Sequence, residues 1–310
     1  MKTITVVTPC FNEEDNIIDI YQQIKVIFEG FPQYNYQHLF IDNASTDKTV
    51  SLIKTIIQQD SKVQLIVNAR NFGHVRSPYY GLLQVKTDAA ILIAADLQEP
   101  PEVIKEFIKK WEQGAEAVVG VKPQSKESKL FFLIRQFYYS LVTKVAEVNL
   151  IKNYTGFGLY DKKILNILRE LDDPHPYFRG LITDLGFYTV KVSYIQPTRK
   201  RGFSKNNFYA LYDMAMLGFT SHSKVPLRFA TLFGFGLAIF SLLISVFYLI
   251  RKLLYWNSFA IGMAPLVIGL FFFASVQLLF LGVLGEYVMQ VLAQVKKRPL
   301  VVEKERINLE

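Results

Sequence analysis

Two short polar segments, each placed after an apolar run, contain residue types that bind nucleotides and metal ions. The first, residues 42–47, reads Asp-Asn-Ala-Ser-Thr-Asp and precedes a helical pattern. Ser45, Thr46 and Asp47 suit the start of a helix, so helix capping is one interpretation. A carboxylate at a strand end also accepts hydrogen bonds from a base or a ribose, which makes Asp42 a candidate nucleotide contact.

The second segment, residues 96–101, follows the apolar run 91–95 and leads into a proline-started helix. Asp96 and Gln98 supply hard oxygen atoms. Mg²⁺ and Mn²⁺ prefer such ligands and often take only one or two from the protein, with the rest from water and a diphosphate. A metal here would neutralise charge on a departing nucleoside diphosphate. A solvated strand end is the alternative that this segment alone leaves open.

The elements that must position these segments alternate between β-rich runs and helical patterns. Such alternation is typical of an α/β fold with a mostly parallel sheet covered by helices, in which ligands bind where strands end. The expected strands are residues 3–8, 36–41, 63–67, 89–94, 117–121 and 187–195, and the expected helices are residues 13–28, 47–58, 75–85, 101–111 and 129–147.

Two long uncharged runs occupy the C-terminal part of the chain. Residues 229–250 and 253–285 are each long enough to cross roughly 30 Å of hydrocarbon, so two transmembrane helices are expected. Ahead of them, the apolar face of residues 208–220 predicts a helix in the headgroup plane. The expected organisation is a catalytic domain at 1–200, a basic and amphipathic segment at 201–225, a transmembrane hairpin at 226–290 and a cytoplasmic tail at 291–310.

The chain of 310 residues carries a net charge of +8, and its basic residues gather beside the apolar runs. More Lys and Arg flank the two runs than separate them, which predicts that both termini and the catalytic part face the cytoplasm. The N-terminus lacks an apolar core of secretory length, and the single Cys10 suits a reducing compartment and core packing. Because no nucleic-acid-binding motif occurs, the charge favours membrane lipids and phosphorylated substrates over nucleic acid.

Five segments, taken in order, carry a resemblance to a known family. They are residues 9–14 (Pro-Cys-Phe-Asn-Glu-Glu), 42–47, 70–73 (Arg-Asn-Phe-Gly), 95–101 (Ala-Asp-Leu-Gln-Glu-Pro-Pro) and 201–205 (Arg-Gly-Phe-Ser-Lys). With its two apolar runs, the chain resembles family 2 glycosyltransferases, and more narrowly the polyisoprenyl-phosphate glycosyltransferases. The resemblance covers nearly the whole chain. It implies the GT-A fold and inverting transfer of a sugar from a nucleotide-sugar, expected to be a UDP-sugar, to undecaprenyl phosphate at the inner membrane.

The resemblance also implies roles for individual residues. The catalytic residues would be Asp96, Arg201 and Lys205, and Asp96 with Gln98 would hold Mg²⁺ or Mn²⁺. The nucleotide would contact residues of three of these motifs: Pro9, Phe11, Glu13, Asp42, Asn43, Ala95, Asp96 and Gln98. The donor diphosphate and the acceptor phosphate would meet cations and one hydroxyl: Lys122, Arg135, Arg201, Ser204 and Lys205. These cations would offset the negative charges that donor and acceptor bring together.

Three departures from the family pattern affect the candidate site. Ala94 stands where relatives commonly have the first Asp of an Asp-x-Asp motif, and Asn43 with Ala44 replaces Asp-Gly. Gly156 and Gly158 occupy the positions of an Asp and an Arg, so no catalytic base is predicted there. A phosphate monoester is already largely dianionic at neutral pH and needs little deprotonation. Positioning and charge neutralisation would therefore dominate catalysis.

Two other functions stay open at the level of sequence. A processive polysaccharide synthase on the same fold would need more spans and a Gln-x-x-Arg-Trp segment, and the chain has neither. A catalytically weak nucleotide-binding scaffold that presents its spans to a flippase or a second transferase is favoured by Ala94, Gly156 and Gly158. Glycines within the apolar runs would permit close helix packing and hence a homo-oligomer.

Overall fold

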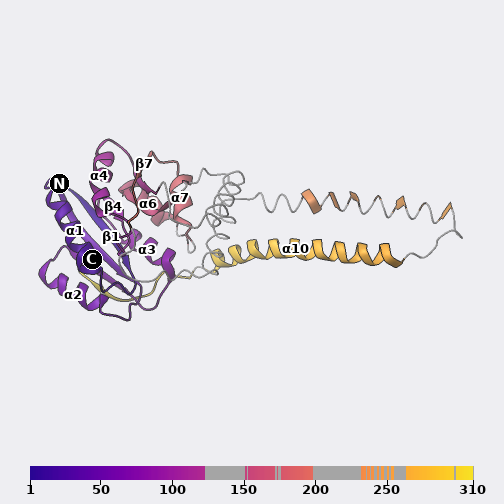
Figure 1. Ribbon diagram of the computed structural model, residues 1–310, viewed down its shortest axis with the longest axis horizontal. Coiled ribbons are helices and arrows are strands. Elements are labelled where there is room, and N and C mark those ends of the chain that lie inside the picture. The colour runs from indigo at the N-terminus through magenta and orange to yellow at the C-terminus, as the bar shows by residue number, and fades with distance from the viewer. Residues whose placement is uncertain are drawn as a thin grey trace.

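The protein is described by a computed structural model that covers residues 1–122, 151, 153–171, 173, 176–197, 263–296 and 298–309, together with single positions between 232 and 254. A compact domain of helices and strands carries one long helix that extends away from it (Figure 1). Within these described residues, eight strands form one sheet in the order β7-β5-β6-β4-β1-β2-β3-β8. The expected α/β fold with a mostly parallel sheet is confirmed.

The first four strands and the helices between them follow the alternation predicted from the sequence. The strands are β1 (Lys2–Cys10), β2 (Tyr34–Asp42), β3 (Val63–Asn68) and β4 (Ala89–Leu92), and they are parallel. The helices are α1 (Ile17–Glu29), α2 (Thr49–Gln59), α3 (Gly73–Gln84) and α4 (Ile104–Glu112), the last entered through the 3₁₀ turn η1 (Pro101–Val103). Because these strands are parallel, their carboxyl ends meet at one edge of the sheet.

Further strands extend the sheet on both sides. β5 (Ala117–Val121) and β7 (Thr189–Ser193), both predicted, pair in parallel, whereas β6 (Tyr154–Asp161) lies antiparallel between β4 and β5. β8 (Glu303–Ile307) lies antiparallel along β3. β6, β8 and two helices, α6 (Lys162–Glu170) and α7 (Phe178–Asp184), were not predicted from the sequence. The segment expected to be a tail therefore contributes a strand to the catalytic sheet.

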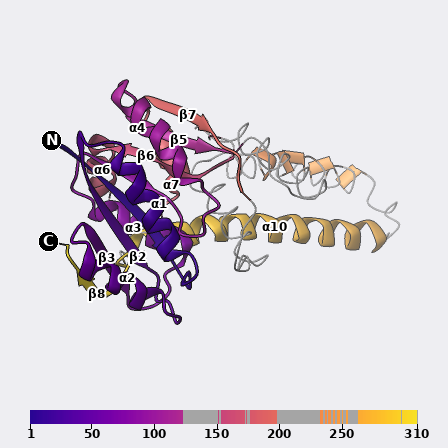
Figure 2. The ribbon, with the colours of Figure 1, turned by 60° about the vertical axis from the view of Figure 1, so that its left-hand side comes forward.

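Helices cover both faces of the sheet (Figure 2), and an apolar core lies between the sheet and the helices on each face. Helices α1, α2 and α4 pack on one face through residues such as Ile20 and Phe107, and α3, α6 and α7 pack on the other through residues such as Leu165. Successive side chains of β1 alternate between the two cores, with Val6 in the first and Val7 in the second. Each such side chain stabilises the fold by about 1.5–3 kcal/mol when fully buried.

The long helix α10 (Met263–Val295) has 33 residues, a length of about 50 Å at 1.5 Å per residue. Its window Phe272–Met289 is apolar, and none of it is buried inside the protein. It is the one helix among the described residues that is long and apolar enough to span a membrane. The second expected span, residues 229–250, is described only at single positions and is not confirmed. The helices expected at 129–147 and 208–220 lie outside the described residues.

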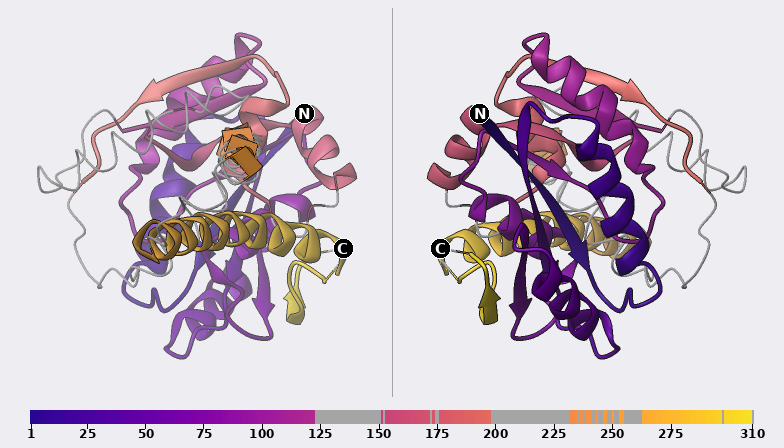
Figure 3. Two further views of the ribbon diagram at one scale, coloured as in Figure 1. Left: turned by 90° about the vertical axis from the view of Figure 1, so that its right-hand side faces the viewer. Right: turned by 90° about the vertical axis from the view of Figure 1, so that its left-hand side faces the viewer.

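β8 brings the chain from the base of α10 back to the catalytic domain (Figure 3). On the way, the carbonyl oxygen of Pro299 accepts a hydrogen bond from Arg76 Nη2 at 2.6 Å. Within β8, Glu303 accepts a hydrogen bond from the Tyr80 hydroxyl at 2.9 Å. Arg76 and Tyr80 both lie on α3. The segment after α10 is therefore hydrogen-bonded to β3 and to α3 of the domain.

Candidate functional site

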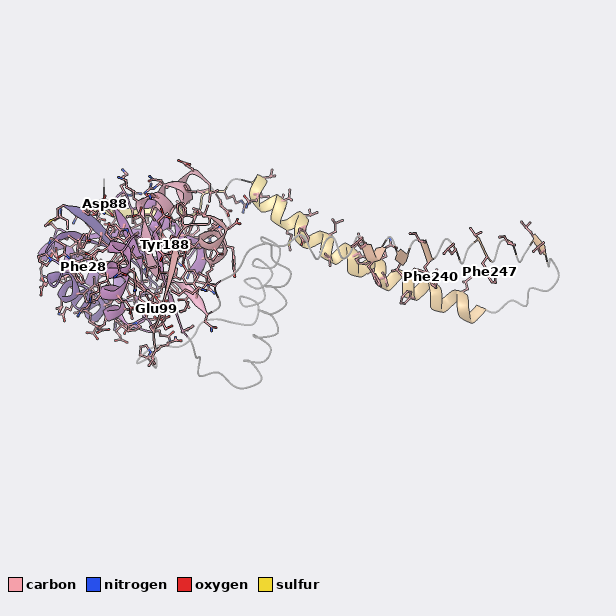
Figure 4. The ribbon with its side chains drawn as sticks, turned by 90° about the horizontal axis from the view of Figure 1, so that it is seen from above. Phe28, Asp88, Glu99, Tyr188, Phe240 and Phe247 are labelled. Carbon is pink, nitrogen blue, oxygen red and sulfur yellow. The ribbon has the colours of Figure 1, made fainter. Side chains whose placement is uncertain are left out.

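The carboxyl ends of the parallel strands meet at a pocket of about 440 Å³. Its walls come from the ends of β1, β2 and β4, the first turns of α3, the start of β6 and the start of α7. This edge of the sheet faces the side from which α10 extends. In Figure 4, Glu99, which follows β4, lies further than Asp88, which precedes β4, along the direction in which α10 extends. The pocket is therefore at the end of the domain that lies toward the apolar helix.

The loops after β1 and β2 are joined by reciprocal hydrogen bonds. The Asn12 N–H donates to Ser45 Oγ at 2.8 Å, and the Thr46 N–H donates to Asn12 Oδ1 at 2.8 Å. Each loop also holds one residue in the left-handed region, Asn12 with φ 55° and Ala44 with φ 64°. An L-residue pays a steric penalty there. The two loops thus keep a defined shape beside Pro9 and Phe11, which line the pocket.

Asp42 is fully buried at the end of β2. Its Oδ2 accepts a hydrogen bond from the Ser45 N–H at 2.9 Å. Desolvation raises the pKa of Asp42, and hydrogen bonds from Ser45 and Ala44 oppose that shift. Cys10 is buried in the core, as expected, and burial, followed by the charge of Asp42, raises the pKa of its thiol. Asp42 thus stabilises the loop after β2, and its contact with a nucleotide stays a prediction.

Asn43 joins the loop after β2 to the loop after β3. Its Nδ2 donates to Asn71 Oδ1 at 2.9 Å and to the Gly73 carbonyl oxygen at 3.2 Å. Its Oδ1 accepts hydrogen bonds from Asn68 Nδ2 at 3.1 Å and from the Phe72 N–H at 2.9 Å. The amide thereby uses both donors and both lone pairs within the protein. Asn43 shapes the entrance to α3 at the pocket wall, and a direct nucleotide contact stays a prediction.

The remaining predicted nucleotide contacts lie next to these loops. Glu13 Oε2 accepts a hydrogen bond from Asn16 Nδ2 at 2.6 Å, and the Glu13 N–H donates to Thr49 Oγ1 at 2.9 Å. Ala95 is buried, and its N–H donates to the Pro9 carbonyl oxygen at 3.4 Å. These bonds connect β1 with the starts of α1 and α2 and with the end of β4. The residues predicted from three separate motifs are thus brought to one edge of the sheet.

Asp96 and Gln98 follow β4 in a turn whose middle residue, Leu97, has φ 56°. The Gln98 N–H donates to Asp96 Oδ1 at 3.1 Å, and Gln98 Oε1 accepts a hydrogen bond from Gln196 Nε2 at 3.0 Å. Carboxylate and amide oxygens carry more than one lone pair, so this pair fits a hard divalent cation. Within the described chain, no three His, Cys, Asp or Glu side chains form a cluster suited to a metal. A cation held here would take its other ligands from water and a diphosphate.

Lys122 lies at the end of β5 and is connected to this turn. Its Nζ donates to Gln196 Oε1 at 3.1 Å, and Gln196 in turn donates to Gln98. A predicted phosphate contact and a predicted metal ligand are thus linked through one side chain that the sequence analysis did not identify. The other residues predicted for the phosphates and for catalysis lie outside the described residues: Arg135, Arg201, Ser204 and Lys205.

Glu99 has no role assigned from sequence, yet it lines the pocket. Its Oε2 accepts a hydrogen bond from the Ala94 N–H at 3.0 Å, and its Oε1 accepts one from Thr155 Oγ1 at 2.8 Å. Desolvation by the dense surroundings raises the pKa of Glu99 to about 7, and these two hydrogen bonds oppose the shift. A carboxyl group therefore lies beside Ala94, the position at which the family pattern has an Asp that this chain lacks.

Two further residues that line the pocket have no role assigned from the sequence. His74 belongs to the first turn of α3 and Arg179 to α7, and both line the pocket. Partial burial, followed by the charge of Arg179, lowers the pKa of His74. Spacing along the chain gives no signal that links residue 179 to the strand ends, because α7 reaches the pocket only through the packing of the second core.

The glycines that replace an Asp and an Arg of the family pattern lie in β6. Gly156 lines the pocket with φ 109°, a conformation that favours glycine. A Cβ atom at Gly158 would lie 2.6 Å from the carbonyl oxygen of Val118 in β5. Any side chain at that position would therefore require the two strands to move apart. The close pairing of β5 and β6 explains why this chain has no room for an Arg there.

Comparisons with known proteins agree with this architecture. The model of the family described as "Glycosyl transferase family 2" matches residues 5–169, which include the ends of β1 to β4 and all of β6. The chain is 33% identical to the "Putative glycosyltransferase CsbB" of Bacillus subtilis over 97% of this chain and 91% of that protein. It is 32% identical to the "SfII prophage-derived bactoprenol glucosyl transferase" of Shigella flexneri over 97% of both chains.

A solved structure supports the fold independently of sequence. Mannosyl-3-phosphoglycerate synthase from Rubrobacter xylanophilus superposes with a TM-score of 0.50 over 70% of this chain and 71% of that chain, at 16% identity. At that identity the likeness concerns the fold alone. The family match covers more than half of the 310 residues, and the similarity to CsbB extends over nearly the whole chain. The chain belongs to glycosyl transferase family 2.

Proposed function

We propose that this glycosyltransferase moves a sugar from a nucleotide-sugar to a polyprenyl phosphate and so makes a polyprenyl-phosphate sugar. The observation that carries the proposal is the 32% identity, over 97% of both chains, to a bactoprenol glucosyl transferase. Bactoprenol is a polyprenol. The similarity continues beyond residues 5–169, through the apolar helix α10 and the strand β8. The shared region therefore includes the part of the chain suited to a lipid substrate as well as the nucleotide fold.

The placement of the pocket supports a substrate in the membrane surface. α10 exposes its apolar window without cover from the described protein, which is favourable in lipid and unfavourable in water. The strand ends face the side of the domain from which α10 extends (Figure 2). A phosphate at the headgroup plane is thus on the same side as the pocket. The proposal includes a cytoplasmic catalytic domain and a UDP-sugar donor, as the sequence suggested.

The proposed reaction needs little proton transfer. An oxygen of the dianionic polyprenyl phosphate attacks the anomeric carbon, the new carbon–oxygen bond forms, and the bond from that carbon to the nucleoside diphosphate breaks. Asp96 and Gln98 would hold Mg²⁺ or Mn²⁺, which when bound neutralises charge on the leaving diphosphate. Lys122, through Gln196, adds a positive charge near the same turn. The loops after β1 and β2 would orient the nucleotide, since positioning supplies much of the rate.

A lipid-labelling assay tests the proposal. Full-length protein in detergent receives undecaprenyl phosphate, Mg²⁺ or Mn²⁺, and one radiolabelled nucleotide-sugar at a time from a panel of UDP- and GDP-sugars. At least one donor should give a labelled lipid that is stable to base and cleaved by mild acid. Asp96→Ala should abolish labelling. The matched control is Asp19→Asn, which removes an exposed carboxylate on α1 and should label like the wild type.

The outcomes separate the proposal from its rivals. If no donor labels the lipid while nucleotide binding is intact, the transferase proposal is wrong and the scaffold is favoured. If the labelled product is a polymer, and this polymer still forms when the lipid acceptor is left out, the processive synthase is favoured. If Asp96→Ala labels lipid at the wild-type rate, transfer occurs but the assignment of Asp96 is wrong.

A further inference from the structure

Arg179 is a cation at the pocket wall without a partner in the described part of the chain. Its side chain is half-buried and lines the pocket, and the described residues offer it no hydrogen bond or ion pair. Arg169, on the neighbouring helix α6, is different, because its Nε donates to the Leu83 carbonyl oxygen at 2.9 Å. A guanidinium has five N–H donors in a rigid fork. As far as the described residues show, those of Arg179 are available to a ligand in the pocket.

Glu99 supplies hydrogen-bond acceptors in the same pocket. Each of its carboxylate oxygens accepts one hydrogen bond, from Ala94 and from Thr155, and each has a further lone pair. The two hydrogen bonds fix the direction of the carboxylate, because one comes from the chain after β4 and the other from β6. His74 adds a ring nitrogen at the rim. The pocket therefore presents a donor group, Arg179, together with an acceptor group, Glu99, whose direction is fixed.

This combination suits a polyol better than an anion. A dianionic phosphate inside the pocket could accept hydrogen bonds from Arg179, but it has no donor for the acceptor oxygens of Glu99. A sugar hydroxyl donates one hydrogen bond and accepts others, so a ring with several hydroxyls satisfies both groups. Phe11 and Tyr177 also line the pocket and offer apolar surface to the carbon–hydrogen face of a ring. The volume of about 440 Å³ lies within the usual range for small-ligand sites.

The position of Glu99 along the chain points to the same ligand. It follows directly after Gln98, one of the two residues proposed for the metal and the donor diphosphate. In a nucleotide-sugar, the sugar is bonded to the second phosphate. A donor whose diphosphate lies at Asp96 and Gln98 must place its sugar within a few ångströms of that turn. The pocket beside Glu99 is next to the turn.

We propose that Arg179 and Glu99 form the subsite for the donor's hexose and determine which hexose is accepted. Arg179 donates hydrogen bonds to sugar hydroxyls, and Glu99 accepts hydrogen bonds from them. The inference rests on the proposed function, because it requires a nucleotide-sugar donor. It adds the residues that contact the sugar, which neither the family pattern nor the expected nucleotide and phosphate contacts supply.

Comparing a donor with its own nucleoside diphosphate isolates the sugar contact. Calorimetry on the full-length protein in detergent would use the donor that labels the lipid and the matching nucleoside diphosphate. Arg179→Gln should weaken donor binding about tenfold or more, as expected for a lost hydrogen bond from a charged group, and leave diphosphate binding unchanged. Arg179→Lys, which keeps the charge but loses the fork, should show an intermediate loss. Arg298→Gln, an exposed residue between α10 and β8, is the matched control.

Glu99→Gln tests the other half of the subsite. The amide can still accept a hydrogen bond from the Ala94 N–H and bond with the Thr155 hydroxyl, so the wall should stay in place. The NH₂ group of this amide is a hydrogen-bond donor, whereas the carboxylate oxygen that it replaces is an acceptor. The ratio of kcat/KM for the preferred hexose to that for its C4 epimer should therefore change by about tenfold. An unchanged thermal unfolding midpoint would confirm that each variant is folded.

Several results would overturn the inference while leaving the proposed function intact. An equal loss of donor and diphosphate affinity in Arg179→Gln would place Arg179 on the diphosphate. A rise only in the KM for undecaprenyl phosphate would place it on the acceptor. Unchanged affinity and unchanged KM would show that Arg179 contacts neither. By contrast, if none of the tested donors gives a labelled lipid with the wild-type protein, the proposed function is contradicted, and the hexose subsite with it.

Discussion

The Thr155 hydroxyl donates a hydrogen bond to Glu99 Oε1 at 2.8 Å, and this bond joins β6 to the loop after β4. The two residues are far apart in sequence but form one wall of the pocket. β6 is antiparallel to β4, so its first residues lie next to the carboxyl end of β4. The wall is thus made by a strand that enters the site from the opposite direction to the strands carrying the predicted motifs.

Replacing Thr155 by Val should loosen this wall. Val keeps the branched shape but removes the hydroxyl, which leaves Glu99 Oε1 without its donor and should lower the free energy of unfolding by about 1 kcal/mol. We also expect a lower kcat/KM, because Glu99 loses a fixed direction. Thr155→Ser retains the hydroxyl and should behave like the wild type. Thermal unfolding and initial rates of lipid labelling measure the two effects, and equal values for Val and Ser would refute the role of the hydrogen bond.

Removal of divalent metal should abolish transfer. Treatment with EDTA is expected to stop lipid labelling, and added Mg²⁺ or Mn²⁺ should restore it. Asp96→Asn keeps the size of the side chain but removes its charge, so kcat/KM should fall by about 10²–10³ through lost stabilisation of the leaving diphosphate. The Asp19→Asn protein serves as the control for charge alone. Full activity after EDTA would mean that Asp96 and Gln98 do not act through a metal.

Ala44 provides a test of backbone strain at the site. Its φ of 64° carries a penalty of roughly 1–2 kcal/mol for an L-residue, whereas glycine's greater freedom in the unfolded chain costs about 0.5–1 kcal/mol. Ala44→Gly should therefore leave the free energy of unfolding unchanged or raise it by up to about 1.5 kcal/mol. At the exposed Ala69, outside the left-handed region, the same substitution should lower it. Chemical unfolding followed by fluorescence compares Ala44→Gly with Ala69→Gly. A clear loss in the free energy of unfolding for both variants would contradict the backbone strain at Ala44.

The buried side chain of His38 should make the free energy of unfolding depend on pH. It is fully buried on β2, hydrogen-bonded to Thr8, and burial lowers its pKa from 6.5 to about 3. Between those values the unfolded chain binds a proton that the native protein does not, so stability falls as pH falls through that window. The slope from this group is up to about 1.4 kcal/mol per pH unit. Unfolding of His38→Gln from pH 7 to 4 should show a shallower slope, whereas parallel curves would mean that His38 is not responsible.

Deletion of residues 301–310 should destabilise the catalytic domain. It removes the buried Val301 and the partly buried Ile307 and exposes the edge of β3, a loss of about 2–4 kcal/mol from apolar burial. The control is Lys54→Ala, which removes the half-exposed ion pair to Glu305 and should cost less than about 1 kcal/mol. Thermal unfolding in detergent measures both. If the deletion costs no more than the control, β8 does not stabilise the domain.

The sequence predicted the first half of the fold well because its signals are local. From β1 to β5 each strand is an apolar run that ends at polar residues, and each helix repeats its apolar residues at helical spacing. β6 was missed because Gly156 and Gly158 interrupt its apolar pattern. β8 was missed because Glu303–Ile307 is mostly charged, as an edge strand with one exposed face permits.

The candidate site was predictable only in part for a similar reason. Pro9, Phe11 and Asp96 could be named because they follow strands whose ends must converge. Glu99 and Arg179 could not, because the direction of Glu99 toward β6 and the approach of α7 depend on tertiary packing. The sequence also gave no sign that Asn43 uses its whole amide inside the protein.

The two edge strands of the sheet, β7 and β8, lie in the sequence on either side of the segment that contains α10. After α10, Arg76 of α3 donates a hydrogen bond to the Pro299 carbonyl oxygen, and β8 then pairs with β3, so the C-terminal end of the apolar helix is attached to the domain at two successive points. A single flexible tether would let the domain roll over the bilayer and point its pocket anywhere. Two such attachments resist that rotation. The enzyme and its lipid acceptor would then encounter each other by diffusion in the plane of the membrane. The orientation of the catalytic domain would already be restricted before any substrate binds.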